Sequence, residues 1–240
     1  MTGTDGLAVQ PGALSDPPEP GTGIGYIAGS PKDYDRAHAL DVAQLFAFLR
    51  ATQPKAFKKL ALGGDTNDIN RLKFLERLSA EIGKRGVVDV LRRGVDHGPV
   101  RLGLFYGTPS PGNATAAALN ALNRFSITRQ LAYSRNETRR ALDLGLFING
   151  LPVATFELKN SLTKQNAADA VEQYKRDRDP CERLFAFGRC AVHFAVDDSQ
   201  VLMCTELKGK ASWFLPFNKG FNDGAGNPPN PDGLKTDYLW

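Results

Sequence analysis

The chain of 240 residues is 42% hydrophobic, which suffices for one sizeable core and is ordinary for a globular protein. It contains no apolar run of about 18 residues and no basic and apolar leader, so we expect neither a membrane span nor secretion. A formal net charge of +4 permits nucleic acid as a partner but does not require it.

The N-terminal residues are rich in proline, glycine and small polar side chains. Such a composition buries too little apolar area to offset the entropy of ordering. We therefore expect a flexible tail over residues 1–25 and one folded domain over residues 26–240.

The first part of this domain is predicted to be helical, because its apolar residues recur at helical spacing over residues 34–50 and 68–84. Asp33 or Asp35 is the expected N-cap of the first helix, and Gly83 and Gly86 mark the end of the second. The following elements are predicted as strands over residues 87–91 and 100–105, a helix over 113–123 and a strand over 125–133.

The centre of the chain is predicted to form a hairpin, because two apolar runs flank an Asn-Gly-Leu-Pro break at residues 149–152. Three charged residues interrupt these runs, namely Asp143, Glu157 and Lys159. Alternation along a strand puts Glu157 and Lys159 on one face. A strict two-residue loop would turn Asp143 away from them, whereas an odd loop length or one bulge would bring all three together. We therefore predict a three-residue or otherwise odd connection, with its positive φ at Gly150.

Charges in such apolar strands are unfavourable unless they are paired or bind a metal. Carboxylate oxygens suit Mg²⁺ or Mn²⁺, and Asp143 and Glu157 would supply them. Lys159 would stabilise the negative charge that develops on a phosphate during phosphodiester hydrolysis. The alternative is a salt-bridged pair of strands, since E-x-K alone is a weak signal.

The chain after the hairpin is predicted to form an amphipathic helix over residues 165–176, with Ala168, Val171 and Tyr174 turned inward. Short strands are expected over residues 184–187, 191–196 and 200–205, with a loop-like end over 213–240. His193 lies between apolar neighbours and is expected to be a core histidine. Three cysteines without C-x-x-C spacing favour reduced thiols and a cytoplasmic protein.

The segment D-x13-E-x-K resembles the PD-(D/E)xK nuclease core, and more closely the N-terminal nuclease domain of the restriction (R) subunit of type I restriction-modification enzymes. The resemblance extends to "YDRAHALD", "RGVVDVLRRGV", "NRFSITRQLAYS", "DAVEQYKRDRDP", "CAVHFAVD" and "FLPFNKG". It implies a restriction-endonuclease-like α/β fold, in which helices flank a mixed, mostly antiparallel central sheet.

The resemblance also implies roles for single residues. The family's metal-binding acids fall on Asp143 and Glu157, and its catalytic lysine falls on Lys159. The family often adds Gln-x3-Tyr on the next helix. Gln173 fits the first position, but the tyrosine here is the adjacent Tyr174. Glu76 and Glu81 are candidates for the extra acid that related nucleases carry on an earlier helix, although an exposed helix face explains both equally well.

The function that the resemblance implies is Mg²⁺-dependent cleavage of double-stranded DNA, with modification and specificity subunits as partners. ATP would act only through a motor domain, and no G-x4-G-K-[ST] motif occurs here. We therefore expect a fragment that carries the nuclease module. Two other hypotheses remain: a docking module with a nuclease-like fold that binds without cleaving, and a nuclease of the same core that acts in repair or on RNA.

The basic residues form groups ahead of the acidic site, and some of them are expected to contact phosphates. Alanine at Asp143, Glu157 or Lys159 is expected to abolish cleavage with little loss of folding.

Overall fold

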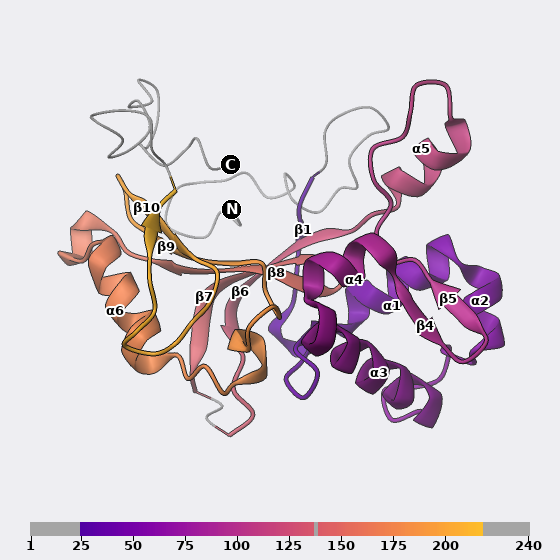
Figure 1. Ribbon diagram of the computed structural model, residues 1–240, viewed down its shortest axis with the longest axis horizontal. Helices are drawn as coiled ribbons and strands as arrows, with labels where there is room; N and C mark the ends of the chain where they lie inside the picture. The colour runs from indigo at the N-terminus through magenta and orange to yellow at the C-terminus, as the bar shows by residue number, and fades with distance from the viewer. Residues whose placement is uncertain (1–24, 137–138, 218–240) are drawn as a thin grey trace.

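The computed structural model describes residues 25–136 and 139–217 (Figure 1). Apart from Gly25, the tail expected over residues 1–25 lies outside this part of the chain. The described residues form a seven-stranded sheet of order β1-β6-β7-β8-β9-β10-β11. Its strands are β1 (Ile27–Ala28), β6 (Phe125–Ala132), β7 (Ala141–Ile148), β8 (Leu151–Leu158), β9 (Val192–Val196), β10 (Val201–Cys204) and β11 (Leu215–Pro216).

The sheet is mixed and mostly antiparallel, as the sequence predicted. Strand β1 runs parallel to β6, and β8 runs parallel to β9, while the other neighbours are antiparallel. The parallel step from β8 to β9 needs a long crossover, and α6 (Ala167–Asp177) lies within it. This connection places a helix over β8, which carries Glu157 and ends one residue before Lys159.

The remaining helices gather at the other end of the molecule, on the right in Figure 1. They pack around one apolar cluster built on Phe46, Phe48, Phe74 and Leu78. The helices are α1 (Val42–Thr52), α2 (Pro54–Lys59), α3 (Ile69–Arg85) and α4 (Val87–Arg93), and the hairpin of β4 (Val95–His97) and β5 (Val100–Leu102) lies beside them. Helix α5 (Ala114–Ala121) projects away from this end.

Apolar side chains cover both faces of the sheet. Ala170, Val171 and Tyr174 of α6 pack on one face with Phe147 and Phe185. Phe156 lies on the other face, where its ring stacks on Phe194 at 5.0 Å between centroids. Because successive residues of a strand alternate, the neighbours of Phe156 on β8 point towards α6. Among the described residues, no helix is both long and apolar enough to cross a bilayer.

Local structure differs from the sequence prediction at the start of the domain. The helix expected over residues 34–50 begins at Val42, because Asp41, and not Asp33 or Asp35, caps it by accepting a hydrogen bond from Gln44 N. The preceding residues pair as the two short strands β2 (Tyr34–Asp35) and β3 (Leu40–Asp41).

Two predicted strands are helical instead. Residues 87–91 belong to α4, whose buried Val87, Val90 and Leu91 have helical spacing. Gly86, at a φ of 80°, ends α3 and lets the chain turn directly into α4. Residues 183–185 form a 3-10 turn in place of the strand expected over residues 184–187. In both places burial against neighbouring elements overrides the β propensity of a short apolar run.

Candidate active site

The turn between β7 and β8 has two residues, so the odd connection expected from the sequence is wrong. Asn149 and Gly150 both have positive φ, of 51° and 83°, as in a type I′ hairpin turn. Gly150 is the position with positive φ that the sequence indicated. A Cβ there would also lie 2.4 Å from the carbonyl oxygen of Asp41, so the close approach of α1 requires a glycine.

A bulge in β8 performs the role that was assigned to an odd loop. Phe147 pairs with Pro152, but Leu146 pairs with Ala154, which leaves Val153 as an extra residue on β8. The alternation beyond the bulge is therefore shifted by one. Since Leu144 then pairs with Phe156, Asp143 lies across from Glu157 and on the same face.

The side chain of Asp143 is half-buried and held through both oxygens. Leu158 N donates to Oδ2 at 2.8 Å, and Gln130 Nε2 donates to Oδ1 at 3.3 Å. Gln130 itself has a φ of 47°, in the left-handed region that residues other than glycine rarely adopt. An unfavourable backbone conformation therefore adjoins the acid, a combination common at functional sites.

The side chain of Glu157 is completely buried. Its Oε1 accepts a hydrogen bond from Arg178 Nε at 2.6 Å, while its Oε2 has no hydrogen-bond partner among the described residues. Burial raises the pKa of Glu157 to about 7; the negative charge of Asp143 adds to the rise, and Arg178 and Lys159 oppose it. A buried carboxylate oxygen without a partner is costly, which makes this atom a candidate metal ligand.

Arg178 is a residue that sequence reasoning missed. It is 5% exposed, and besides Glu157 it donates to the hydroxyl of Tyr133 at 3.2 Å and to the carbonyl oxygen of Ala141 at 3.0 Å. Arg178 follows α6 directly and so returns towards the strands that α6 covers. It lies in a run of charged residues that looks like an exposed surface, so no sequence signal distinguished it from its neighbours.

Helix α6 contributes Gln173 to the site. Gln173 Oε1 accepts a hydrogen bond from Lys159 Nζ at 2.6 Å, which joins the lysine to the helix. The next residue, Tyr174, is fully buried, and its hydroxyl lies 2.9 Å from Thr155 Oγ1 on β8. Tyr174 thus anchors α6 on the sheet, and Gln173, one step round the helix, reaches the lysine.

A buried histidine completes this anchor. His193 Nδ1 lies 2.7 Å from Thr155 Oγ1, and burial lowers the pKa of His193 to about 4, so the ring is neutral at physiological pH. It is the core histidine expected from the sequence. Ala168, in contrast, is exposed, and Ala167 and Ala170 occupy the buried face instead.

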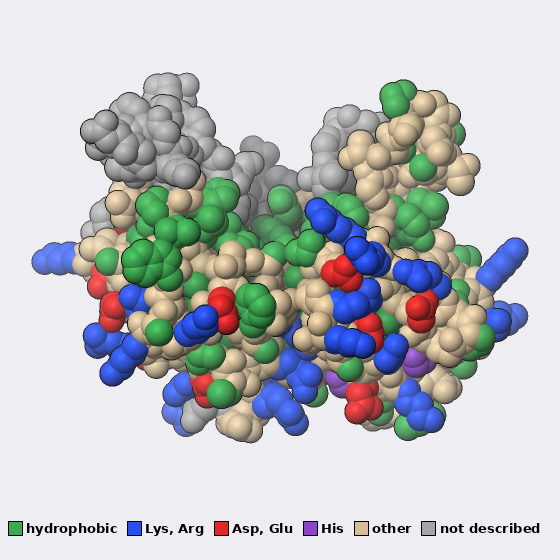
Figure 2. Space-filling model, viewed as in Figure 1, with side chains coloured by type: hydrophobic (Ala, Val, Ile, Leu, Met, Phe, Trp, Pro, Cys, Tyr) green, Lys and Arg blue, Asp and Glu red, His purple; other side chains and the backbone are tan. Residues whose placement is uncertain are grey.

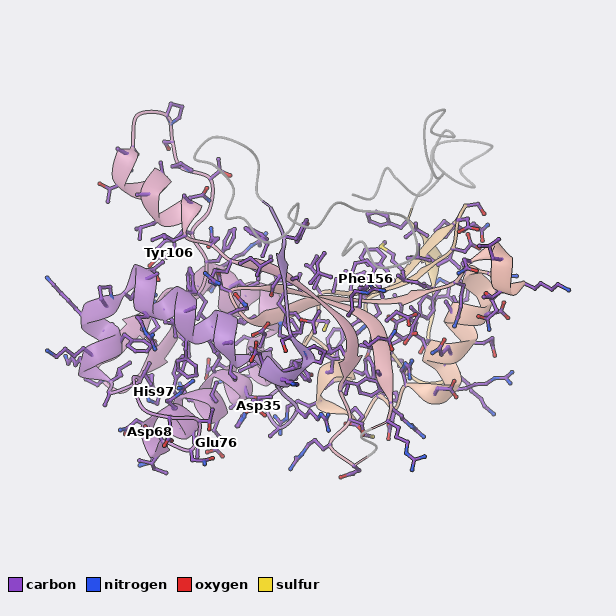
Figure 3. The ribbon with its side chains drawn as sticks, turned by 180° about the vertical axis from the view of Figure 1, so that it is seen from behind. Asp35, Asp68, Glu76, His97, Tyr106 and Phe156 are labelled. Atoms are coloured by element: carbon purple, nitrogen blue, oxygen red, sulfur yellow. The ribbon has the colours of Figure 1, made fainter. Side chains whose placement is uncertain are left out.

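The acidic candidates on α3, Glu76 and Glu81, lie apart from the cluster of Asp143, Glu157, Lys159 and Gln173. Glu81 forms ion pairs with Arg77 and Arg85 on its own helix. Figure 3 shows Glu76 at the outer edge of the helical end, well separated from Phe156 on the central sheet. Neither residue therefore joins Asp143 and Glu157 through the contacts that the structure describes.

The atoms of the cluster that could bind a metal are the carboxylate oxygens of Asp143 and Glu157. Two carboxylates lie on one face, and no group of three or more His, Cys, Asp or Glu side chains suited to a metal occurs among the described residues. Oxygen ligands suit a hard divalent cation that completes its shell with water and phosphate. The unpartnered Oε2 of Glu157 fits such an ion.

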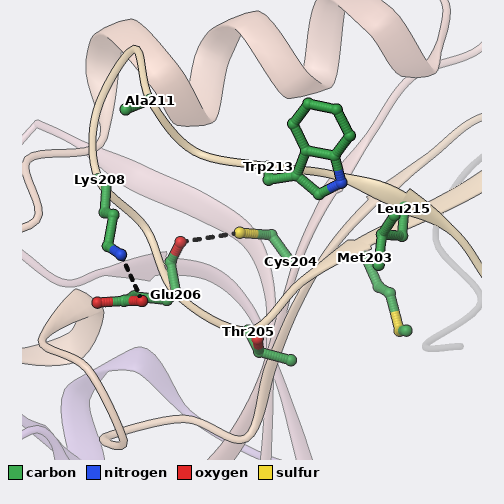
Figure 4. A pocket seen from close by; sticks show the side chains of 8 residues that line it. All are labelled: Met203, Cys204, Thr205, Glu206, Lys208, Ala211, Trp213 and Leu215. Atoms are coloured by element: carbon green, nitrogen blue, oxygen red, sulfur yellow. Dashed lines mark hydrogen bonds and ion pairs between the residues drawn. The ribbon is translucent and has the colours of Figure 1, made fainter.

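A hollow of about 220 Å³ lies elsewhere, beyond the edge of β10 (Figure 4). Cys204 and Trp213 line it, and Lys208 forms an ion pair with Glu206 at its rim, at 2.8 Å. None of Asp143, Glu157 and Lys159 contributes to it. This hollow is therefore separate from the candidate site.

Basic side chains are spread over the face seen in Figure 2 and form no single patch there. Two of the arginines in the basic groups ahead of the acidic site are held by the protein itself. Arg85 pairs with Glu81 and Asp89, and Arg124 donates to Gln44 Oε1 at 2.7 Å. These two guanidinium groups are therefore already engaged within the protein.

Searches among curated proteins and among solved structures found no match to this chain. A family model, described as the type I restriction enzyme R protein N terminus, matches residues 38–212. This range holds most of the described elements and all four residues of the cluster, Asp143, Glu157, Lys159 and Gln173, and the seven-stranded mixed sheet is consistent with a restriction-endonuclease-like fold. The chain therefore belongs to the family of N-terminal regions of type I restriction enzyme R proteins.

Proposed function

We propose that this chain is the DNA-cleaving module of a type I restriction enzyme, a Mg²⁺-dependent endonuclease that hydrolyses phosphodiester bonds of double-stranded DNA. The observation that carries the proposal is the buried Oε2 of Glu157, which has no hydrogen-bond partner among the described residues and lies on the same sheet face as Asp143. The family supports the assignment to a restriction system. Modification and specificity subunits are the proposed partners, and ATP would act through a motor domain.

Each side chain has a physical task in this proposal. Asp143 and Glu157 provide the oxygens that would hold Mg²⁺, or Mn²⁺ in its place. The ion, when bound, would polarise the phosphate and favour deprotonation of the attacking water. Lys159 carries a positive charge to the same face and would stabilise the charge that accumulates on the phosphate oxygens.

Gln173 would act on the lysine. Its Oε1 accepts from Lys159 Nζ at 2.6 Å, which restricts a long and flexible side chain to one direction. Because Gln173 is fixed by the docking of α6 through Tyr174, the helix and the hairpin together would set the position of the ammonium group.

The test is cleavage of supercoiled plasmid at excess protein, with and without Mg²⁺. Asp143→Asn and Lys159→Met should each lower the rate at least about 100-fold, the scale seen when one transition-state contact is removed. Glu172→Gln is the matched control, because Glu172 is an exposed carboxylate next to Gln173 on α6 and should leave the rate unchanged.

Three results would decide between the hypotheses. Cleavage retained in the Asp143 or Lys159 variant would reject the proposed site. Binding of DNA without any nicking by the wild type would favour the docking module. Preferential cleavage of RNA in a mixture of RNA and double-stranded DNA would favour the third hypothesis.

A further inference from the structure

Arg178 connects the strands that carry the two acids of the cluster. Its Nε binds Glu157 on β8 at 2.6 Å, and a terminal nitrogen binds the carbonyl oxygen of Ala141 at 3.0 Å, two residues before Asp143 on β7. The other terminal nitrogen binds the hydroxyl of Tyr133, directly after β6, at 3.2 Å. One guanidinium group therefore contacts three neighbouring chain segments at the same end of the sheet.

The contact with Arg178 gives the two carboxylate oxygens of Glu157 different surroundings. Oε1 is occupied by the arginine, whereas Oε2 is equally buried and has no partner within the described part of the chain. Since the arginine fixes the orientation of the carboxylate plane, it also fixes where Oε2 lies relative to Asp143.

We propose that Arg178 is a positioning residue that sets the distance and direction between Glu157 Oε2 and Asp143 and so determines the affinity of the site for a divalent cation. This inference rests on the proposed function. Arg178 does not touch the reacting atoms; it acts through Glu157 and through the backbone of β7.

The planar fork of arginine is required for this role. It donates to the three acceptors in fixed directions, whereas a lysine has one nitrogen on a flexible stem and retains only the charge. Arg178→Lys therefore separates geometry from electrostatics. Loss of a side chain that hydrogen-bonds to a metal ligand commonly lowers metal affinity by about 10-fold to 100-fold, which sets the expected effect.

A matched control is available in the same chain. Arg189 is also buried, at 3% exposed, and donates to Ser79 and to the carbonyl oxygen of His38, outside the cluster. Arg189→Lys thus removes a buried guanidinium group without altering Glu157. Thermal unfolding of both variants shows whether each is folded at the temperature of the measurement.

The experiment measures Mn²⁺ binding to the protein without DNA, by electron paramagnetic resonance. The wild type should bind Mn²⁺ and Asp143→Asn should not. Arg178→Lys should weaken binding at least about 10-fold, while Arg189→Lys should bind as the wild type does. Equal affinity in Arg178→Lys and the wild type would overturn the role of Arg178 alone. Absence of Mn²⁺ binding in the wild type would overturn the proposed metal site as well.

If Arg178→Lys does not fold, a Mg²⁺ titration of the wild type followed by nuclear magnetic resonance tests the role of Arg178. The Nε–Hε resonance of Arg178 should shift on titration with Mg²⁺, because the ion draws on the same carboxylate. The resonance of Arg189, whose Nε has no hydrogen-bond partner among the described residues, should not move. Tyr133→Phe would assign the Arg178 signal by removing its neighbouring acceptor. An Arg178 resonance that stays in place at saturating Mg²⁺ would reject the inference.

Discussion

Replacement of Glu157 by alanine should destabilise the protein far more than the same change at Asp143. The structure thereby alters the sequence-based expectation that both variants fold almost normally. Glu157 is completely buried, and its Oε1 lies 2.6 Å from Nε of Arg178, which is 5% exposed. Asp143 is half-buried and accepts its shorter hydrogen bond from a backbone N–H.

The magnitude follows from the ion pair. At an effective dielectric constant of about 20, two unit charges at this separation attract each other by roughly 6 kcal/mol, and the cost of desolvation offsets much of that. Removal of one partner leaves the buried guanidinium without a counter-charge, which costs about 3–5 kcal/mol. The loss at Asp143 should be about 1 kcal/mol, since of its two hydrogen bonds only the one from Leu158 N is partly buried and the one from Gln130 is exposed.

The assay is urea unfolding at pH 8, where Glu157 is ionised because its pKa of about 7 lies below the pH. The free energy of unfolding of Glu157→Ala should lie at least about 2 kcal/mol below that of Asp143→Ala. The double variant Glu157→Leu with Arg178→Met should recover most of the loss, because an apolar pair leaves no buried charge. Equal stability of the two single variants would show that the ion pair does not carry this energy.

Two further predictions concern residues around the cluster. Burial lowers the pKa of His193 to about 4. Below about pH 6.5, His193 therefore binds a proton in the unfolded chain but not in the folded protein. Stability should therefore be complete above pH 6.5 and fall by up to about 3 kcal/mol towards pH 4. His193→Asn should reduce this loss in urea unfolding at pH 7.5 and 4.5, and an unchanged pH dependence would contradict the assignment. At Gln130, with its φ of 47°, glycine should be more stable than alanine by about 1 kcal/mol, and both should slow cleavage because Asp143 loses the amide contact. Equal stability of the glycine and alanine variants would argue against the strained backbone.

The sequence predicted most of the sheet and the helices α3 and α6. The strands over residues 125–133, 191–196 and 200–205 form close to their expected bounds as β6, β9 and β10. Helix α3 begins after Asp68, whose side chain accepts from the backbone N–H groups of Asn70 and Arg71. Such elements carry their own local signals, which are caps and alternating or helical apolar spacing.

Short apolar runs were predicted least well. Residues 87–91 are compatible with a strand or a helix on local grounds, and packing against the helical cluster selects the helix. The bulge at Val153 was likewise not located from the sequence. Nothing in the residue types around it marks the extra position, although the need to bring Asp143 and Glu157 onto one face required some irregularity.

Residue type and spacing in the sequence alone indicated Asp143, Glu157 and Lys159 as candidates for the site, and the resemblance to the nuclease family added Gln173. Tertiary structure alone decided how they are held. Arg178 reaches Glu157, and Tyr174 bonds Thr155 on β8, through contacts between different segments of the chain, and the partner in such a contact is not given by the sequence pattern. The depth at which Glu157 is buried, and therefore its dependence on an arginine, follows from packing that only the folded chain creates.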